Sequence, residues 1–380
     1  MKEYKVLLLY RVMIPSLILC GDEQFKYLAE HKKLDYRSRT VYEVTSEDLN
    51  WANIVVIGRL DSWYERKVTE ILYKANKYII YIIDDDLLNI PKEISSSSYY
   101  GQSDIRNNIQ QMIEMSKALI SPSPKILEKY GEGKKKIQIE EPTVYPFAYK
   151  AHNSNKAIKI GFAGSIDRTH DVETILYDTL KTIKNKYGEK VEIEFFGAIP
   201  SFAKELNAKC ISYSDSYKGY IEKLNSLDWD IGLAPMPDSE FHSCKHYIKI
   251  IEYSEVGIYP IYSNQGPYLR FNKEYGLGTM LPNETDAWVK TIEDLIEHRD
   301  NLEQQRKLVN EEICTYMSVE NCSNKLLDDL DRTIDVSLKS KNVTANLIVF
   351  KSTGFSKRVI SALKSRIIKL KQKILKRGKS

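Results

Sequence analysis

Short runs of uninterrupted apolar residues constrain this chain most, because they alternate with segments of helical periodicity. Residues 54–57 read IVVI and residues 78–83 read YIIYII, with a helical segment between them around 68–75. Shorter runs at 5–9 and 118–120 extend the pattern. Strands that are apolar on both sides need cover on both faces, which is typical of a parallel sheet between helices. The first half is therefore predicted to be a doubly wound α/β domain.

The second half repeats this pattern. Strands are predicted at 158–165, 191–196, 210–213, 231–234 and 259–262, with a helix over 217–227 and three helical stretches between 284 and 330. Residues 133–156 contain two prolines and are interpreted as a linker. We thus predict two Rossmann-like domains, residues 1–150 and 156–335, followed by a basic C-terminal tail, residues 336–380.

The composition is that of a soluble globular protein. Of the 380 residues, 42% are hydrophobic and 28% are charged, and no apolar run approaches the roughly 20 residues of a membrane span. The five cysteines are scattered and lack metal-site spacing, which argues against a disulfide framework and for a reducing compartment. We therefore expect a cytoplasmic enzyme.

Residues 230–268 hold the densest set of candidate binding residues. An apolar run (231–234), a break at Pro235 and Pro237, helical spacing from Tyr247 and a second apolar run (259–262) predict a strand, a loop, a helix and a strand. The turn at 263–267, which contains Ser263, Asn264 and Gly266, is rich in backbone donors. Ligands of open α/β sheets bind at the carboxyl ends of such strands.

Three ionisable residues of this segment are predicted to share one helix face. Lys245, Lys249 and Glu252 are spaced by four and three residues, so their charged groups can converge on one ligand. Ammonium groups suit a diphosphate, and a carboxylate can accept hydrogen bonds from two ribose hydroxyls. The alternative is a solvated helix face with alternating charges.

These residues resemble the donor-binding segment of retaining glycosyltransferases of the GT-B fold, the large group called family 4 or glycosyl transferases group 1. The resemblance lies in the Lys-bearing helix, Glu252-Tyr253 and the run Gly-Ile-Tyr-Pro-Ile-Tyr-Ser-Asn that follows. In that family the helix carries two glutamates separated by seven residues, and the second contacts the ribose. Glu252 matches the second position, whereas Cys244 stands at the first. The resemblance implies two domains facing across a cleft and transfer with retention.

A second phosphate-binding segment is predicted where the second domain begins. The strand at 158–165 ends in Gly164 and Ser165 before a helix, and a helix N-terminus favours an anion. The resemblance implies that Arg168 neutralises a phosphate and that His170 lies in the same loop; His170 is equally well explained as a helix N-terminal residue. With Arg168, Lys245 and Lys249 on the diphosphate, neither a metal nor another cofactor is required.

Three consecutive aspartates, Asp84 to Asp86, follow the apolar run at 78–83. They leave three interpretations open. Asp84 and Asp86 could hold a divalent cation against a diphosphate. The resemblance instead implies that Asp84 contacts the sugar or the acceptor, and a third reading has the acids capping the next helix. Asp84, Lys249 and Arg168 are the predicted catalytic residues.

The C-terminal tail has a charge unlike that of the rest of the chain. Residues 351–380 hold 11 of the 56 Lys and Arg residues and no Asp or Glu, so the remainder carries 45 basic and 52 acidic residues. Apolar residues recur near helical spacing over 355–377, which favours an anionic membrane surface. Two other readings are a helix packed on the acidic body and a phosphate contact with nucleic acid; nucleic acid is not the partner that we predict.

Together with the family resemblance, these patterns predict a glycosyltransferase that moves a sugar from a nucleotide-diphosphate donor to a glycan or lipid-linked acceptor, in cell-surface polysaccharide synthesis and peripheral on the inner membrane face. The alternatives are a sugar-nucleotide epimerase of the same fold, which needs acid–base carboxylates and His across the cleft, and an inactive nucleotide-binding scaffold, which Cys244 in place of a glutamate would suit.

Overall fold

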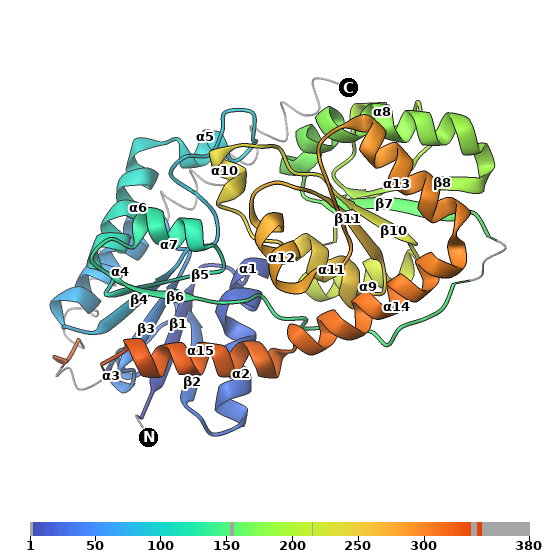
Figure 1. Cartoon of the computed structure of the whole chain (residues 1–380). Coiled ribbons are helices and arrows are strands. Elements are labelled where there is room, and N and C mark those ends of the chain that lie inside the picture. Colours follow the sequence, from blue (N-terminus) through green and yellow to red (C-terminus); the bar gives the residue numbers. More distant parts are fainter. Residues whose placement is uncertain (1–2, 153–155, 215, 336–339, 344–380) are drawn as a thin grey trace.

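The computed structural model describes residues 3–152, 156–214, 216–335 and 340–343. The first half forms a six-stranded parallel sheet in the order β2-β1-β3-β4-β5-β6 (Figure 1). Its strands are β1 (Lys5–Tyr10), β2 (Asp35–Thr40), β3 (Ile54–Gly58), β4 (Tyr78–Ile82), β5 (Ala118–Ser121) and β6 (Lys135–Gln138). Its helical segments are α1 (Pro15–Leu17), η1 (Ile18–Asp22), α2 (Glu23–Glu30), α3 (Ser46–Trp51), α4 (Trp63–Lys74), α5 (Ser97–Tyr100), α6 (Ser103–Met115) and α7 (Pro124–Tyr130).

Both faces of this sheet are buried, as the apolar runs predicted. Successive side chains of a strand point to opposite faces. Leu7 and Leu9 of β1 therefore join one core, under α4 and α6, whereas Val6 and Leu8 join another, under α2. The layering of helices above and below a parallel sheet follows from this alternation.

The second half forms another six-stranded parallel sheet, in the order β12-β11-β10-β7-β8-β9. Its strands are β7 (Ile158–Gly164), β8 (Val191–Gly197), β9 (Lys209–Ile211), β10 (Ile231–Ala234), β11 (Tyr259–Ser263) and β12 (Thr279–Leu281). Its helical segments are η2 (Ile166–Arg168), α8 (Thr169–Tyr187), η3 (Gly188–Lys190), η4 (Ser201–Ala203), α9 (Tyr217–Ser226), α10 (Glu240–Ser243), α11 (Ile248–Glu255), α12 (Pro267–Tyr275), α13 (Thr285–Glu297), α14 (Arg299–Tyr316) and α15 (Val319–Thr333).

Close packing in the core of the second half explains why one residue within a strand is glycine. A Cβ atom added to Gly161 of β7 would lie 2.1 Å from the ring of Trp229, which is fully buried. A distance this short cannot be accommodated against a packed ring. Gly161 therefore lets the indole lie directly on the strand, and the indole Nε1 donates to Glu194 at 2.9 Å.

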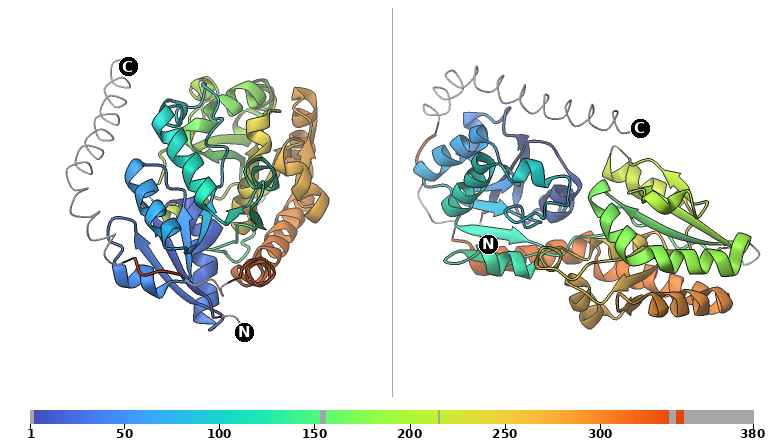
Figure 2. Two further views of the ribbon diagram at one scale, coloured as in Figure 1. Left: turned by 90° about the vertical axis from the view of Figure 1, so that its left-hand side faces the viewer. Right: turned by 90° about the horizontal axis from the view of Figure 1, so that it is seen from above.

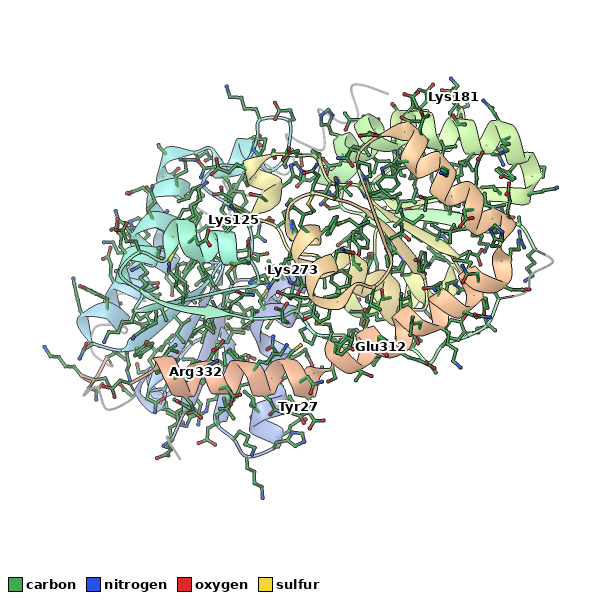
Figure 3. The ribbon with its side chains drawn as sticks, viewed as in Figure 1. Tyr27, Lys125, Lys181, Lys273, Glu312 and Arg332 are labelled. Atoms are coloured by element: carbon green, nitrogen blue, oxygen red, sulfur yellow. The ribbon has the colours of Figure 1, made fainter. Side chains whose placement is uncertain are left out.

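The last described helix returns to the first half. Helix α15 contacts α2 and β6, and its Leu326 and Leu330 are buried in the core beneath the first sheet. Figure 2 shows α14 and α15 along one side of the molecule, and Figure 3 places Tyr27 of α2 beside α15, which carries Arg332. The domain limits themselves stay a prediction, because α15 follows the second sheet in sequence but packs on the first.

One prediction about the linker is wrong. Residues 135–138, within the predicted linker 133–156, form edge strand β6, which pairs with β5. Only Ile137 of this strand is buried, so its KKIQ sequence lacks the apolar run that marked the inner strands.

No helix in the described ranges is long and apolar enough to cross a bilayer. The tail prediction for 355–377 falls outside the described residues.

Candidate active site

A cavity of about 350 Å³ lies between the two halves, where strands of both sheets end. Its walls include residues that directly follow β3, β4, β5 and β7, together with residues of α11. The carboxyl ends of parallel strands are the usual ligand-binding edge of such sheets. The acidic and basic side chains lining the cavity are Arg59, Asp84, Asp85, Glu141, Arg168, Lys245, His246, Lys249 and Glu252.

Lys245 reaches this cavity by a different route from the predicted one. The prediction that Lys245 shares a helix with Lys249 and Glu252 is wrong, because α11 begins only at Ile248. Lys245 lies in the segment between α10 and α11, and its Nζ is 2.9 Å from Asp85 Oδ1 of the first half. The three residues therefore line one cavity without sharing one helix face.

Lys249 and Glu252 are held together inside the second half. Lys249 Nζ lies 2.7 Å from Glu252 Oε2, and the Tyr220 hydroxyl donates to the same oxygen at 3.0 Å. Burial and the adjacent Glu252 carboxylate raise the pKa of Tyr220 well above its ordinary value, so its hydroxyl remains a donor. The Glu252 carboxylate is thus fixed at the cavity wall.

Arg168 lies in η2, directly after β7, beside Gly164 and Ser165 in the cavity wall. Its Nη2 donates to the carbonyl of Pro235 at 2.7 Å, and its Nε pairs with Asp171. Its guanidinium position is therefore set by contacts on both sides.

His170 is exposed at the start of α8 and does not line the cavity. The histidine near Arg168 is His242 of α10, whose Nε2 lies 3.4 Å from Asp171 Oδ1. Burial opposes ionisation of Asp171, but His242 and Arg168 hold its pKa below the ordinary value. Asp171 thus orients the Arg168 guanidinium. The one sequence signal for this role was the position of Asp171, three residues after Arg168 and near the start of a helix.

The predicted donor turn after β11 lies next to the cavity without lining it. Ser263 is buried, and its hydroxyl accepts from Met236 N at 2.8 Å and donates to Asn283 at 2.6 Å. Asn264 accepts from Gln265 Nε2. Gly266 has a φ of +53°, which favours glycine, and precedes α12, whose Tyr268 does line the cavity. A role for this turn in ligand binding stays a prediction.

The three aspartates point to three different partners. Asp84 pairs with Arg59 at 2.7 Å, Asp85 with Lys245, and Asp86 with Lys129 at 2.8 Å. Asp86 is fully buried and does not line the cavity. The capping interpretation is wrong, because the next helix begins only at Ser97. Among the described residues, no group of three or more His, Cys, Asp or Glu is arranged to hold a metal ion.

Burial and neighbouring charges give Asp84 and Asp85 opposite pKa shifts. Burial raises the pKa of Asp84, which Arg59 only partly offsets. Burial also acts against ionisation of Asp85, but Lys245 and Arg59 outweigh it and lower the pKa of Asp85. The cavity thus holds one carboxyl that takes up a proton readily and one that stays ionised.

A buried histidine between two glutamates was missed by the sequence analysis. His246 Nδ1 lies 2.6 Å from Glu141, and its Nε2 lies 3.3 Å from Glu140, which also pairs with Arg270 at 3.1 Å. Burial opposes protonation of His246, yet the two carboxylates raise its pKa. The glutamates lie in the predicted linker, so no local pattern indicated that they contact the other half.

Cys244, at the position of the first family glutamate, faces away from the cavity. Its side chain is buried among core residues of the first half, beside Tyr130 and Asp86. No carboxylate could therefore enter the cavity from this position without rearrangement. The carboxylates that line it come from the ends of strands, the linker and α11.

A larger cavity of about 670 Å³ lies at the opposite edge of the second sheet. It is lined by residues at the starts of β7 and β10, including Lys159 and Asp230. None of the predicted site residues lines it.

Comparison with solved structures shows which fold this arrangement represents. An α-glucosyltransferase in complex with UDP and a 13-mer DNA containing an HMU base matches with a TM-score of 0.59 and 11% identity, over 87% of this chain and 100% of the other. HepE from Anabaena, in complex with UDP and glucose, matches with a TM-score of 0.57 and 13% identity, over 87% and 100%. The chain has the GT-B fold.

OtsA matches this GT-B chain with a TM-score of 0.55 and 10% identity, over 88% of this chain and 99% of the other. No family model matches the sequence, and no curated protein matches it. At these identities the likeness is one of fold, and fold alone does not imply function.

Proposed function

We propose that this chain is a glycosyltransferase that uses a nucleotide-diphosphate sugar, with UDP as the nucleotide. The observation that carries the proposal is the convergence of Arg168, Lys245 and Lys249 on one cavity with Glu252, where the two halves meet. Cations and a carboxylate are what a diphosphate joined to a ribose requires. HepE and the α-glucosyltransferase hold UDP, which supports this choice of nucleotide.

The chemistry follows from where charge develops. As the bond between the sugar and the diphosphate breaks, negative charge grows on the diphosphate and positive character grows on the sugar carbon. Preorganised cations bind that transition state more strongly than the ground state and so lower the barrier. Lys245, Lys249 and Arg168 would act on the diphosphate, with amides near Gly164 and Gly266 on the remaining oxygens. A cavity between two halves also excludes water, which competes as acceptor.

The finer features of this proposal rest on the sequence. They are transfer with retention, no metal requirement, a glycan or lipid-linked acceptor in cell-surface polysaccharide synthesis, and an anionic membrane surface bound through 355–377. Activity that survives EDTA would support the absence of a metal. Activity abolished by EDTA and restored by a divalent cation would favour the metal interpretation of Asp84.

A sugar-nucleotide epimerase is the second candidate. The observation that favours it is the pair formed by His246 and Glu141 at the cavity wall, since an epimerase needs a histidine and carboxylates there. An inactive nucleotide-binding scaffold is the third candidate, because Cys244 supplies no carboxylate.

One assay separates the three. The full chain is incubated with UDP- and GDP-sugars, with and without a panel of glycan and lipid-linked acceptors, and the donor is followed. The transferase reading predicts slow donor hydrolysis that becomes transfer when the right acceptor is present. An epimerised donor would identify the second candidate, and a donor that is bound but stays intact with every acceptor would identify the scaffold.

A further inference from the structure

Among the carboxylates of the cavity, Asp85 has an unusual partner. Asp84 pairs with Arg59 inside the first half, and Glu252 pairs with Lys249 inside the second. Asp85 instead reaches across the cavity to Lys245, a cation that the proposed function assigns to the diphosphate. The Asp85 side chain is 28% exposed and that of Lys245 is 17% exposed, so both are open to a ligand in the cavity.

A diphosphate entering the cavity would compete for this pair. It carries more negative charge than one carboxylate, and its oxygens would draw the ammonium group of Lys245. Asp85 would then lose its partner, while Arg59, whose charge also lowers the pKa of Asp85, stays in the same cavity. Binding of the donor therefore leaves the Asp85 carboxylate in the cavity without its ion pair to Lys245.

The other carboxylates of the cavity pair with groups that the proposed function does not assign to the diphosphate, Asp84 with Arg59 and Glu141 with His246, or are assigned to the ribose. Cys244, next to Lys245 in the chain, is buried in the first-half core. Glu252 accepts a hydrogen bond from Lys249, and the proposed function assigns it to the ribose. Asp85 is the described carboxylate that both lines the cavity and contacts a diphosphate-binding cation from the opposite half.

We propose that Asp85, released from Lys245 by the donor diphosphate, is the catalytic carboxylate that stabilises the positive charge developing on the transferred sugar. This inference rests on the proposed function. In the step, the bond between the sugar carbon and the diphosphate oxygen breaks and its electron pair stays with the diphosphate. The acceptor oxygen forms the new bond, and its proton passes to the departing diphosphate. Asp85 takes no part in the covalent exchange; its charge acts on the sugar carbon.

The experiment compares Asp85→Asn with the wild type in two measurements. Turnover is measured as kcat for hydrolysis of whichever UDP- or GDP-sugar the wild type hydrolyses fastest. Affinity is measured by calorimetric titration with UDP, which has no sugar. The expected result is a fall in kcat of about 100-fold or more, with UDP affinity unchanged or several-fold tighter because Lys245 is already free. A merely structural role would weaken both together.

Glu240→Gln is the matched control. It removes another ion pair between the halves, that of Glu240 with Lys129, and neither residue lines the cavity. This variant should keep wild-type kcat and affinity. Asp85→Glu should recover part of the turnover.

The outcomes are distinct. Wild-type turnover by Asp85→Asn would overturn the inference and leave the proposed function intact. Loss of UDP binding together with turnover in Asp85→Asn would also overturn it, as would a full loss in Glu240→Gln. If the wild type neither binds UDP or GDP nor hydrolyses any donor, the proposed function fails and the inference fails with it.

Discussion

Lys249 and Tyr220 hold the Glu252 carboxylate at the cavity wall by hydrogen bonds. The position of this carboxylate therefore does not depend on a bound ligand. We predict that Glu252→Gln weakens UDP binding about tenfold or more, because hydrogen bonds to a charged group contribute roughly 1.5–3 kcal/mol. Calorimetric titration with UDP measures this. Glu255→Gln, on the same helix but outside the cavity, is the control. An unchanged affinity in Glu252→Gln would contradict the assigned ribose contact.

Glu255 itself allows a prediction about pH. It is 1% exposed, and burial together with Glu252 raises its pKa well above the ordinary value of a glutamate. An acid with a raised folded pKa stabilises fully only below its unfolded pKa, and this contribution is lost as the pH rises through the folded pKa. Glu255→Gln removes that loss.

The stability of Glu255→Gln should therefore match that of the wild type near pH 4 and exceed it increasingly at higher pH, by up to about 1.4 kcal/mol for each pH unit until the folded pKa is reached. Denaturant unfolding at a series of pH values tests this. A constant difference across the series would show that folding does not raise the pKa of Glu255.

Residue patterns in the sequence predicted some cavity residues and missed others for identifiable reasons. Lys249 and Glu252 were found because both lie on one helix, where spacing determines the face. Arg59 and His246 were missed because only tertiary folding brings their distant segments to the same cavity. Arg59 follows β3 with a φ of +47°, a conformation that its local sequence does not indicate.

At the scale of elements, apolar runs predicted the inner strands well. They failed for β2 and β6, whose sequences DYRSRT and KKIQ are polar at the edges of the first sheet. Edge strands are less buried, so the hydrophobic signal weakens there. The start of α11 was placed too early because Lys245 continues the helical spacing through a segment where the backbone is not α-helical.

Helix α15 offers a test of how the last described helix packs on the first half. Leu330 is fully buried against the first sheet, and the Tyr4 hydroxyl donates to Asp331 at 2.8 Å. We predict that Leu330→Ala lowers the free energy of unfolding by roughly 2–5 kcal/mol, since it leaves a cavity. Leu308→Ala, at a position that is 45% exposed, should cost far less. Equal effects in denaturant unfolding would argue against this packing.

Over the whole molecule, opposite charges join the two halves around the cavity. Asp85 with Lys245, Glu141 with His246, Glu140 with Arg270 and Glu240 with Lys129 all cross between them. None could be paired from sequence, because each joins segments about a hundred residues or more apart. The two doubly wound halves could be predicted, because they depend on strand and helix order alone, whereas the GT-B form was implied by the family resemblance.

The tail prediction also belongs to the whole molecule. Truncation after Lys351 removes ten basic residues and should release the protein from anionic vesicles, with neutral vesicles as the control. Each cation near the surface contributes on the order of 1 kcal/mol, so the effect should be large in a flotation assay. Unchanged binding to anionic vesicles would refute membrane association through the tail.

The central claim is that one nucleotide diphosphate binds between the halves on cations of the second half. Calorimetric titration of the full chain with UDP tests it most directly, alongside Lys249→Met and, as control, Lys181→Met on the exposed face of α8 (Figure 3). The account predicts saturable binding of one UDP per chain, weakened about tenfold or more by Lys249→Met and unchanged by Lys181→Met. Equal affinity in the wild type and Lys249→Met would contradict it.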